Sequence, residues 1–185
     1  MRYFTAFLLC LLLIGAGACS ATTPQQRYDA AKKKLAAAST DLQRFHALDK
    51  AAKESFNNGK FEDANQYATE LLSSAPNYRS DWNYGNAIQD GNLVLGRLAL
   101  RDGKKDEAKK YLLAAGKSPG SPTMNSFGPN MSLAKDLLDK GERDVVLEYF
   151  ELCRNFWKDG NFELDRWRDE VKNGKSPRFG ANLVY

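Results

Sequence analysis

The chain has 185 residues, with 27 lysines and arginines against 23 acidic residues, and only one histidine and three cysteines. A formal net charge of +4 is too small to predict nucleic-acid binding. A lone histidine, His46, and few cysteines supply neither a metal cluster nor a catalytic triad, so we expect a protein that is not an enzyme and has no cofactor or metal.

The first eighteen residues have the layout of an export signal. Arg2 precedes an apolar run from Tyr3 to Ile14, and the small residues 15–18 follow it. The run is short for a membrane span, and small residues suit a signal peptidase. The sequence therefore predicts a signal peptide over residues 1–18 and an exported protein, with a retained membrane anchor as the alternative.

The end of this segment fits two processing routes. Ala16, Gly17 and Ala18 form an A-x-A site for ordinary signal peptidase, and the same residues before Cys19 resemble a bacterial lipobox. The resemblance implies a diacylglycerol on Cys19, and the following Ser20 implies sorting to the outer membrane, facing the periplasm. Lipidation is favoured because a free thiol at the N-terminus of an exported protein would be reactive. By the other route the protein is free in the periplasm.

Two helices are predicted before the most regular part of the chain. Thr22, Thr23 and Pro24 have the composition of a helix start, which predicts a helix from 24 to about 38 within the N-terminal segment 19–40. Ser39 and Thr40 then predict the cap of a second helix that ends at Gly59.

Three segments of the chain share one spacing of small residues. In each, a glycine lies seven residues after a first crossing residue and five before a second, and a tyrosine follows three residues later. The sets are Ala52, Gly59, Ala64 and Tyr67; Gly96, Gly103, Ala108 and Tyr111; and Ala134, Gly141, Val146 and Tyr149. Antiparallel helices pack closely where the crossing residues are small, and a glycine between them ends the first helix. The spacing predicts three helical hairpins.

This pattern resembles the tetratricopeptide repeat. Residues 58–76 look like the turn, second helix and closing proline of one repeat, LGRLAL with GKKDEA over 95–108 looks like the next, and 130–153 is a third copy. The resemblance implies an all-α, tetratricopeptide-like solenoid of about three repeats over residues 41–157. A helix precedes it, and a capping helix with an irregular tail, whose apolar end docks back onto the domain, occupies residues 158–185.

The copies are longer than the family repeat of about 34 residues. We expect the first excess to extend the next helix backwards, from about 81 to 101. The second excess, 117–129, contains three prolines and two glycines, and we expect a helix-free loop that is functional or mobile. Near the end, an aromatic-rich layer is expected to cover the last repeat; its members are Phe156, Trp157, Phe162, Leu164 and Trp167.

In this family the first helices of successive repeats line a concave groove that binds extended peptides or partner helices. The resemblance implies that the groove is faced by Lys53, Arg97 and Lys135, and one turn later by Asn57, Arg101 and Asp139. The basic side chains would suit an acidic peptide or a C-terminal carboxylate. The alternative is that they simply cover a solvent-facing surface.

A second candidate surface combines aromatic and amide side chains: Trp82, Tyr84, Asn86, Asn125, Phe127 and Asn130. Such a mixture is typical of polar-aromatic binding surfaces, but these residues would equally pack extra helical turns and cap loops. For the whole chain we expect a protein-binding adaptor or assembly factor of the bacterial cell envelope. The alternative is a self-assembling structural envelope lipoprotein without a dedicated ligand.

Overall fold

The computed structural model describes residues 22–183, so the expected signal peptide and the lipidation site at Cys19 lie outside the described residues. Within 22–183 the chain forms nine α-helices, two short 3₁₀ helices and no strand, which confirms the all-α class. In chain order the elements are α1 (Pro24–Ala36), α2 (Asp41–Asn57), α3 (Phe61–Ser74), η1 (Ala75–Tyr78), α4 (Tyr84–Arg101), α5 (Lys105–Gly116), α6 (Pro122–Phe127), α7 (Ser132–Leu138), α8 (Arg143–Cys153), α9 (Asn161–Lys172) and η2 (Gly180–Leu183).

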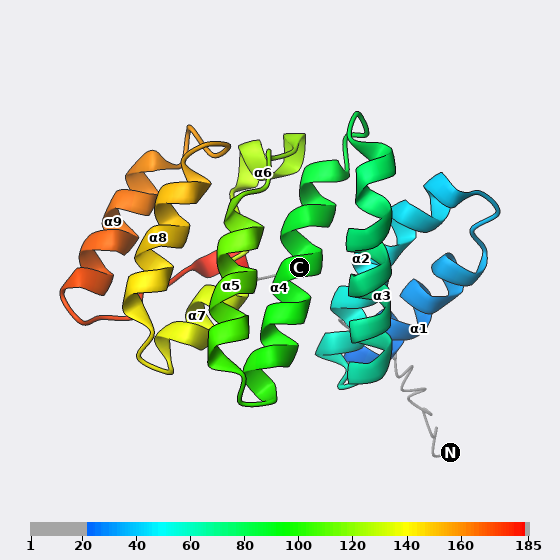
Figure 1. Ribbon diagram of the computed structural model, residues 1–185, viewed down its shortest axis with the longest axis horizontal. Coiled ribbons are helices and arrows are strands. Elements are labelled where there is room, and N and C mark those ends of the chain that lie inside the picture. Colours follow the sequence, from blue (N-terminus) through cyan, green and yellow to red (C-terminus); the bar gives the residue numbers. More distant parts are fainter. Residues whose placement is uncertain (1–21, 184–185) are drawn as a thin grey trace, which may run out of the picture.

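The helices lie side by side along the long axis of the molecule, with α1 at one end and α9 at the other (Figure 1). Three hairpins, α2–α3, α4–α5 and α7–α8, account for the middle of the row. Contacts of α3 with α4 and of α5 with α8 join successive hairpins. The first helices of the hairpins also touch, α2 against α4 and α4 against α7, so they share one side of the molecule.

One turn geometry closes all three hairpins. The turn glycines Gly59, Gly103 and Gly141 have φ of 71°, 78° and 83°, a conformation that glycine adopts without strain. After α2, the Lys60 N–H donates to the Ser55 carbonyl at 2.8 Å, and the Gly59 N–H donates to the Phe56 carbonyl at 3.0 Å. The same pair of bonds recurs after α4 and α7, and it defines a Schellman motif.

A fourth turn of this kind follows α9 and was not predicted. Gly174 has φ of 76°, and the Lys175 N–H donates to the Glu170 carbonyl at 2.9 Å. The signal for it was present, because Asn-Gly-Lys at 173–175 repeats the Asn-Gly-Lys at 58–60. Helix α9 therefore ends as the first helix of a hairpin does, although a tail follows it instead of a second helix.

Helix α4 is buried on opposite faces. Ala87, Val94 and Leu98 belong to a core shared with α2 and α3, whereas Leu93 and Ala99 belong to a core shared with α5, α7, α8 and α9. The predicted long helix from about 81 to 101 is confirmed over Tyr84–Arg101.

The prediction of a helix-free loop over 117–129 is wrong, because α6 lies inside it. The Ser121 hydroxyl accepts a hydrogen bond from the Met124 N–H at 3.1 Å, and Pro122 occupies the first turn, where its missing N–H is not needed. Ser118 is buried and its hydroxyl donates to the Gly85 carbonyl at 2.7 Å. The segment is thereby attached to the start of α4.

The aromatic layer at the end of the row forms with one member fewer than expected. Trp167 is buried. Its ring centroid lies 5.7 Å from that of Trp157 and 5.0 Å from that of Phe179 in the tail. Phe162 does not belong to the layer, since it is 75% exposed. It lies at the start of α9, on the side of the helix that faces away from the core residue Leu164.

Over residues 22–183, no helix has both the length and the apolar character that crossing a membrane requires.

Replacement of Gly85 by alanine should destabilise the protein strongly. A Cβ at this position would overlap the carbonyl oxygen of Gly120, a backbone atom that cannot rotate away. We expect Gly85→Ala to lower the free energy of unfolding by about 3 kcal/mol. In Gly91→Ala, the added Cβ would meet the half-buried side chain of Leu72, which can shift where a backbone carbonyl cannot, so a smaller loss of about 1–2 kcal/mol is expected. Equal losses in urea unfolding would show that the Gly120 carbonyl does not restrict the side chain at position 85.

Candidate functional site

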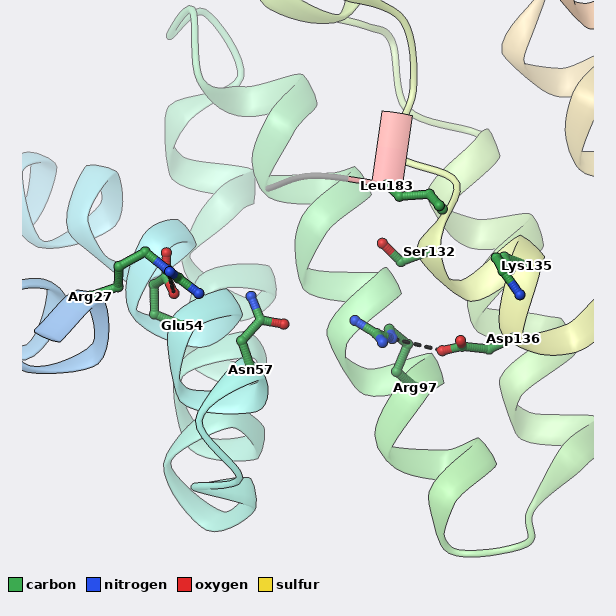
Figure 2. Close-up of a pocket in the computed structure, with 8 residues that line it drawn as sticks. All are labelled: Arg27, Glu54, Asn57, Arg97, Ser132, Lys135, Asp136 and Leu183. Atoms are coloured by element: carbon green, nitrogen blue, oxygen red, sulfur yellow. Dashed lines mark hydrogen bonds and ion pairs between the residues drawn. The ribbon is translucent and has the colours of Figure 1, made fainter. Parts of the chain in front are cut away.

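A cavity of about 520 Å³ lies on the side shared by the first helices of the three hairpins. Figure 2 shows its lining side chains, which come from α1, α2, α4, α7 and the tail. They are Arg27, Glu54, Asn57, Arg97, Ser132, Lys135, Asp136 and Leu183. Both signs of charge are present, so the cavity suits a ligand with polar groups of more than one kind.

The predicted groove residues divide among three neighbouring cavities. Asn57, Arg97 and Lys135, one from each of α2, α4 and α7, meet around the cavity of Figure 2. Arg101 lines an adjoining cavity of about 380 Å³, which it shares with Arg97 and Asp139. Lys53 lines a third cavity, of about 180 Å³. The spacing thus brings three of these six residues together around one cavity, and Arg97 connects them to two more, Arg101 and Asp139.

Each predicted basic residue has an acidic partner within the chain. The pairs are Arg97–Asp136 at 2.8 Å, Lys135–Asp139 at 2.7 Å, Arg101–Asp102 at 2.7 Å, and Lys53 with both Asp49 at 2.9 Å and Asp90 at 2.8 Å. An acidic partner would therefore compete with these carboxylates instead of meeting unpaired charge. That the binding partner is acidic stays a prediction.

Arg97 and Arg101 also stack on aromatic rings of the first hairpin. The Arg97 guanidinium lies 4.4 Å from the ring centroid of Phe56, and that of Arg101 lies 3.9 Å from the ring centroid of Phe61. A guanidinium over an aromatic face is attracted to it by about 0.5–2 kcal/mol, according to how far water is excluded. These contacts join α4 to the α2–α3 turn and hold both arginines in place.

Lys53 differs from the other basic residues because its ion pairs are buried. Burial acts to lower the pKa of the Lys53 ammonium, but the charges of Asp90 and Asp49 raise it above its ordinary value. Burial raises the pKa of the Asp90 carboxyl, Lys53 opposes that rise and Asp49 adds to it. Lys53 therefore connects α2 to α4 as a structural cation at the edge of the groove.

Several lining residues were missed by sequence reasoning. Arg27 reaches the cavity from α1 and pairs with the buried Glu54 at 3.1 Å, and Leu183 reaches it from the tail. Neither α1 nor the tail belongs to the repeat, so its spacing carried no signal for them. Glu54 and Asp136 lie three residues before the predicted Asn57 and Asp139, a spacing that shares one face of a helix, so helical spacing would have found both.

The second predicted surface, of aromatic and amide residues, comes together only in part. Asn86, Phe127 and Asn130 line the 180 Å³ cavity with Lys53. Trp82 is 57% exposed and lies against the His46 ring, with 5.2 Å between centroids, while Tyr84 packs on the core of the first hairpin.

Cys153 and His46, the residues with the most reactive side chains, lie outside the groove and are buried or hydrogen-bonded elsewhere. Cys153 is buried, and burial raises the pKa of its thiol. His46 bonds to Asp81 at 2.8 Å between Nε2 and Oδ1. In the described part of the chain, no group of three or more His, Cys, Asp or Glu side chains is arranged to hold a metal ion.

Comparison with known proteins adds no relative: no family model, curated protein or solved structure matches this chain.

Removal of the Lys53 charge should lower the free energy of unfolding by an amount that depends on pH. Lys53→Met leaves Asp49 and Asp90 facing each other with no cation, and we expect it to lower the free energy of unfolding by about 3–5 kcal/mol at neutral pH. Because burial raises the pKa of Asp90 in the folded state, folding favours its protonated form. The deficit should thus shrink as the pH falls from about 8 to about 5.

The matched control is Lys50→Met on the same helix, where the side chain is exposed and a change below about 0.5 kcal/mol is expected. A similar small loss for both variants in urea unfolding, without dependence on pH, would show that the Lys53 ion pairs contribute little.

Proposed function

We propose that the protein is a tetratricopeptide-like adaptor or assembly factor of the bacterial cell envelope, and that it holds an extended peptide or a segment of a partner protein in the groove of α2, α4 and α7. The supporting observation is the meeting of Asn57, Arg97 and Lys135 around one cavity, each supplied by the first helix of a different hairpin. Only a side of the molecule built by all three hairpins offers such a surface.

The chemistry of the groove supports a peptide over a small apolar ligand. Charged side chains of both signs, an exposed amide and a hydroxyl surround the cavity, and only Leu183 is apolar among its lining residues. A polypeptide carries amide donors, carbonyl acceptors and side chains at regular intervals, which suits a cavity lined by both basic and acidic side chains. The location in the envelope rests on the predicted export signal and the lipobox resemblance of Cys19.

The test is site-specific photocrosslinking in cells. A photoreactive amino acid in place of Asn57 lies in the groove, and the same amino acid in place of Lys110, an exposed residue of α5, is the matched control. We expect a defined crosslinked protein from position 57 and none from position 110. With the partner purified, Lys135→Glu should weaken its binding by about tenfold, while Lys110→Glu leaves it unchanged.

Equal crosslinking from both positions, or none from position 57, would contradict the groove. The alternative function, self-assembly without a dedicated ligand, predicts that position 57 or 110 crosslinks to a second copy of this chain and that light scattering grows with protein concentration.

A further inference from the structure

The tail of the chain already occupies part of the groove. Leu183 lines the 520 Å³ cavity, whereas Ala181 and Asn182 line the 180 Å³ cavity that contains Lys53. The short η2 turn therefore lies between the two cavities, and Figure 2 shows Leu183 at the edge of the larger one, across from Asn57. A peptide that runs along α2, α4 and α7 through both cavities would have to displace these tail residues.

The tail is held by backbone groups, in the way that a peptide ligand is held. The Asn182 side-chain amide donates to two carbonyl oxygens, of Phe127 and Pro129, each at 3.0 Å. The Asn182 carbonyl accepts from the Met131 N–H at 2.7 Å. Two acceptors and one donor thus face a single residue, and a primary amide supplies two donors at once.

The segment that receives the tail is shaped around this amide. Gly128 has φ of 85°, which glycine adopts without strain, and a Cβ there would lie 2.8 Å from Asn182 Nδ2 and 2.7 Å from the Trp157 ring. A side chain at 128 would therefore displace either the amide or the tryptophan. The segment 127–131 leads directly into α7, so tail binding and the position of Lys135 and Asp136 are linked.

We propose that residues 180–183 compete with the ligand for the groove and resemble it. The ligand is a linear peptide with an asparagine whose side-chain amide donates to the Phe127 and Pro129 carbonyls. An aliphatic residue follows this asparagine and lies at the edge of the cavity. This inference rests on the proposed peptide-binding function and names its ligand. Because the tail is tethered, its effective concentration at the site is on the order of millimolar. An external peptide of equal affinity must therefore be present above that concentration to displace the tail.

The test uses Asn182→Asp, which keeps the shape of the side chain but turns the two amide donors into acceptors facing two carbonyl oxygens. The probe is the capped tetrapeptide Gly-Ala-Asn-Leu, the sequence of residues 180–183, titrated into ¹⁵N-labelled full-length chain. We expect the Met131 amide resonance to shift saturably in Asn182→Asp, with an apparent Kd about tenfold lower than in the wild type. The peptide Gly-Ala-Asp-Leu should produce no shift.

Two controls separate displacement of the tail from damage to the fold. Lys175→Ala changes an exposed residue outside 180–183 and should behave as the wild type, and Asn182→Ala should open the site as Asn182→Asp does. Phe179 remains in the aromatic layer in all of these variants, so thermal unfolding should stay close to that of the wild type. Equal peptide affinity for wild type and both Asn182 variants would overturn the inference.

The crosslinking result distinguishes this failure from a failure of the proposed function. If the tetrapeptide does not bind but a partner still crosslinks to position 57, the groove binds a ligand of another class and the tail is only structural. If the inference is correct, Asn182→Asp also increases the yield of crosslinked partner at position 57.

Discussion

Helix α4 buries two opposite faces because its neighbours approach its backbone closely at three glycines. The carbonyl of Gly120 lies against Gly85, the Leu72 side chain of α3 against Gly91, and the Leu133 side chain of α7 against Gly96. Small residues at helix crossings let neighbours approach closely, and here a backbone carbonyl approaches α4 at Gly85 while side chains approach it at Gly91 and Gly96. The two hydrophobic cores meet at this helix, so the relative placement of the first and third hairpins depends on it.

The groove is a consequence of that placement. Since α2 and α7 both pack on α4, their outward-facing side chains converge on the same cavity as Arg97, and the ion pairs Lys53–Asp90 and Arg97–Asp136 connect α4 to each side. The tail then crosses the groove where α7 begins. The tail forms hydrogen bonds with the segment 127–131 in the folded protein. The proposed ligand is a peptide because a peptide can form the same hydrogen bonds once the tail is displaced.

The local features of this structure could be predicted from sequence, and the distant ones could not. The turn glycines and the side of the helix on which Asn57, Arg97 and Lys135 lie follow from helical spacing, which acts over a few residues. The carboxylates of Asp90 and Asp136 could not be assigned to Lys53 and Arg97, because their pairing depends on how separate helices dock. The position of the tail carried no periodic signal at all. Helix α6 shows that the prolines of this segment do not exclude a helix, because Ser121-Pro122 is a regular helix start.

Amide hydrogen exchange shows whether the side formed by α2, α4 and α7 is the recognition surface. The protein would be measured alone and in complex with the partner captured at position 57. We expect slower exchange in α2, α4, α7 and the segment 127–131, with α3, α5 and α8 unchanged. Slower exchange confined to α3, α5 and α8, or to the terminal helices α1 and α9, would contradict this expectation.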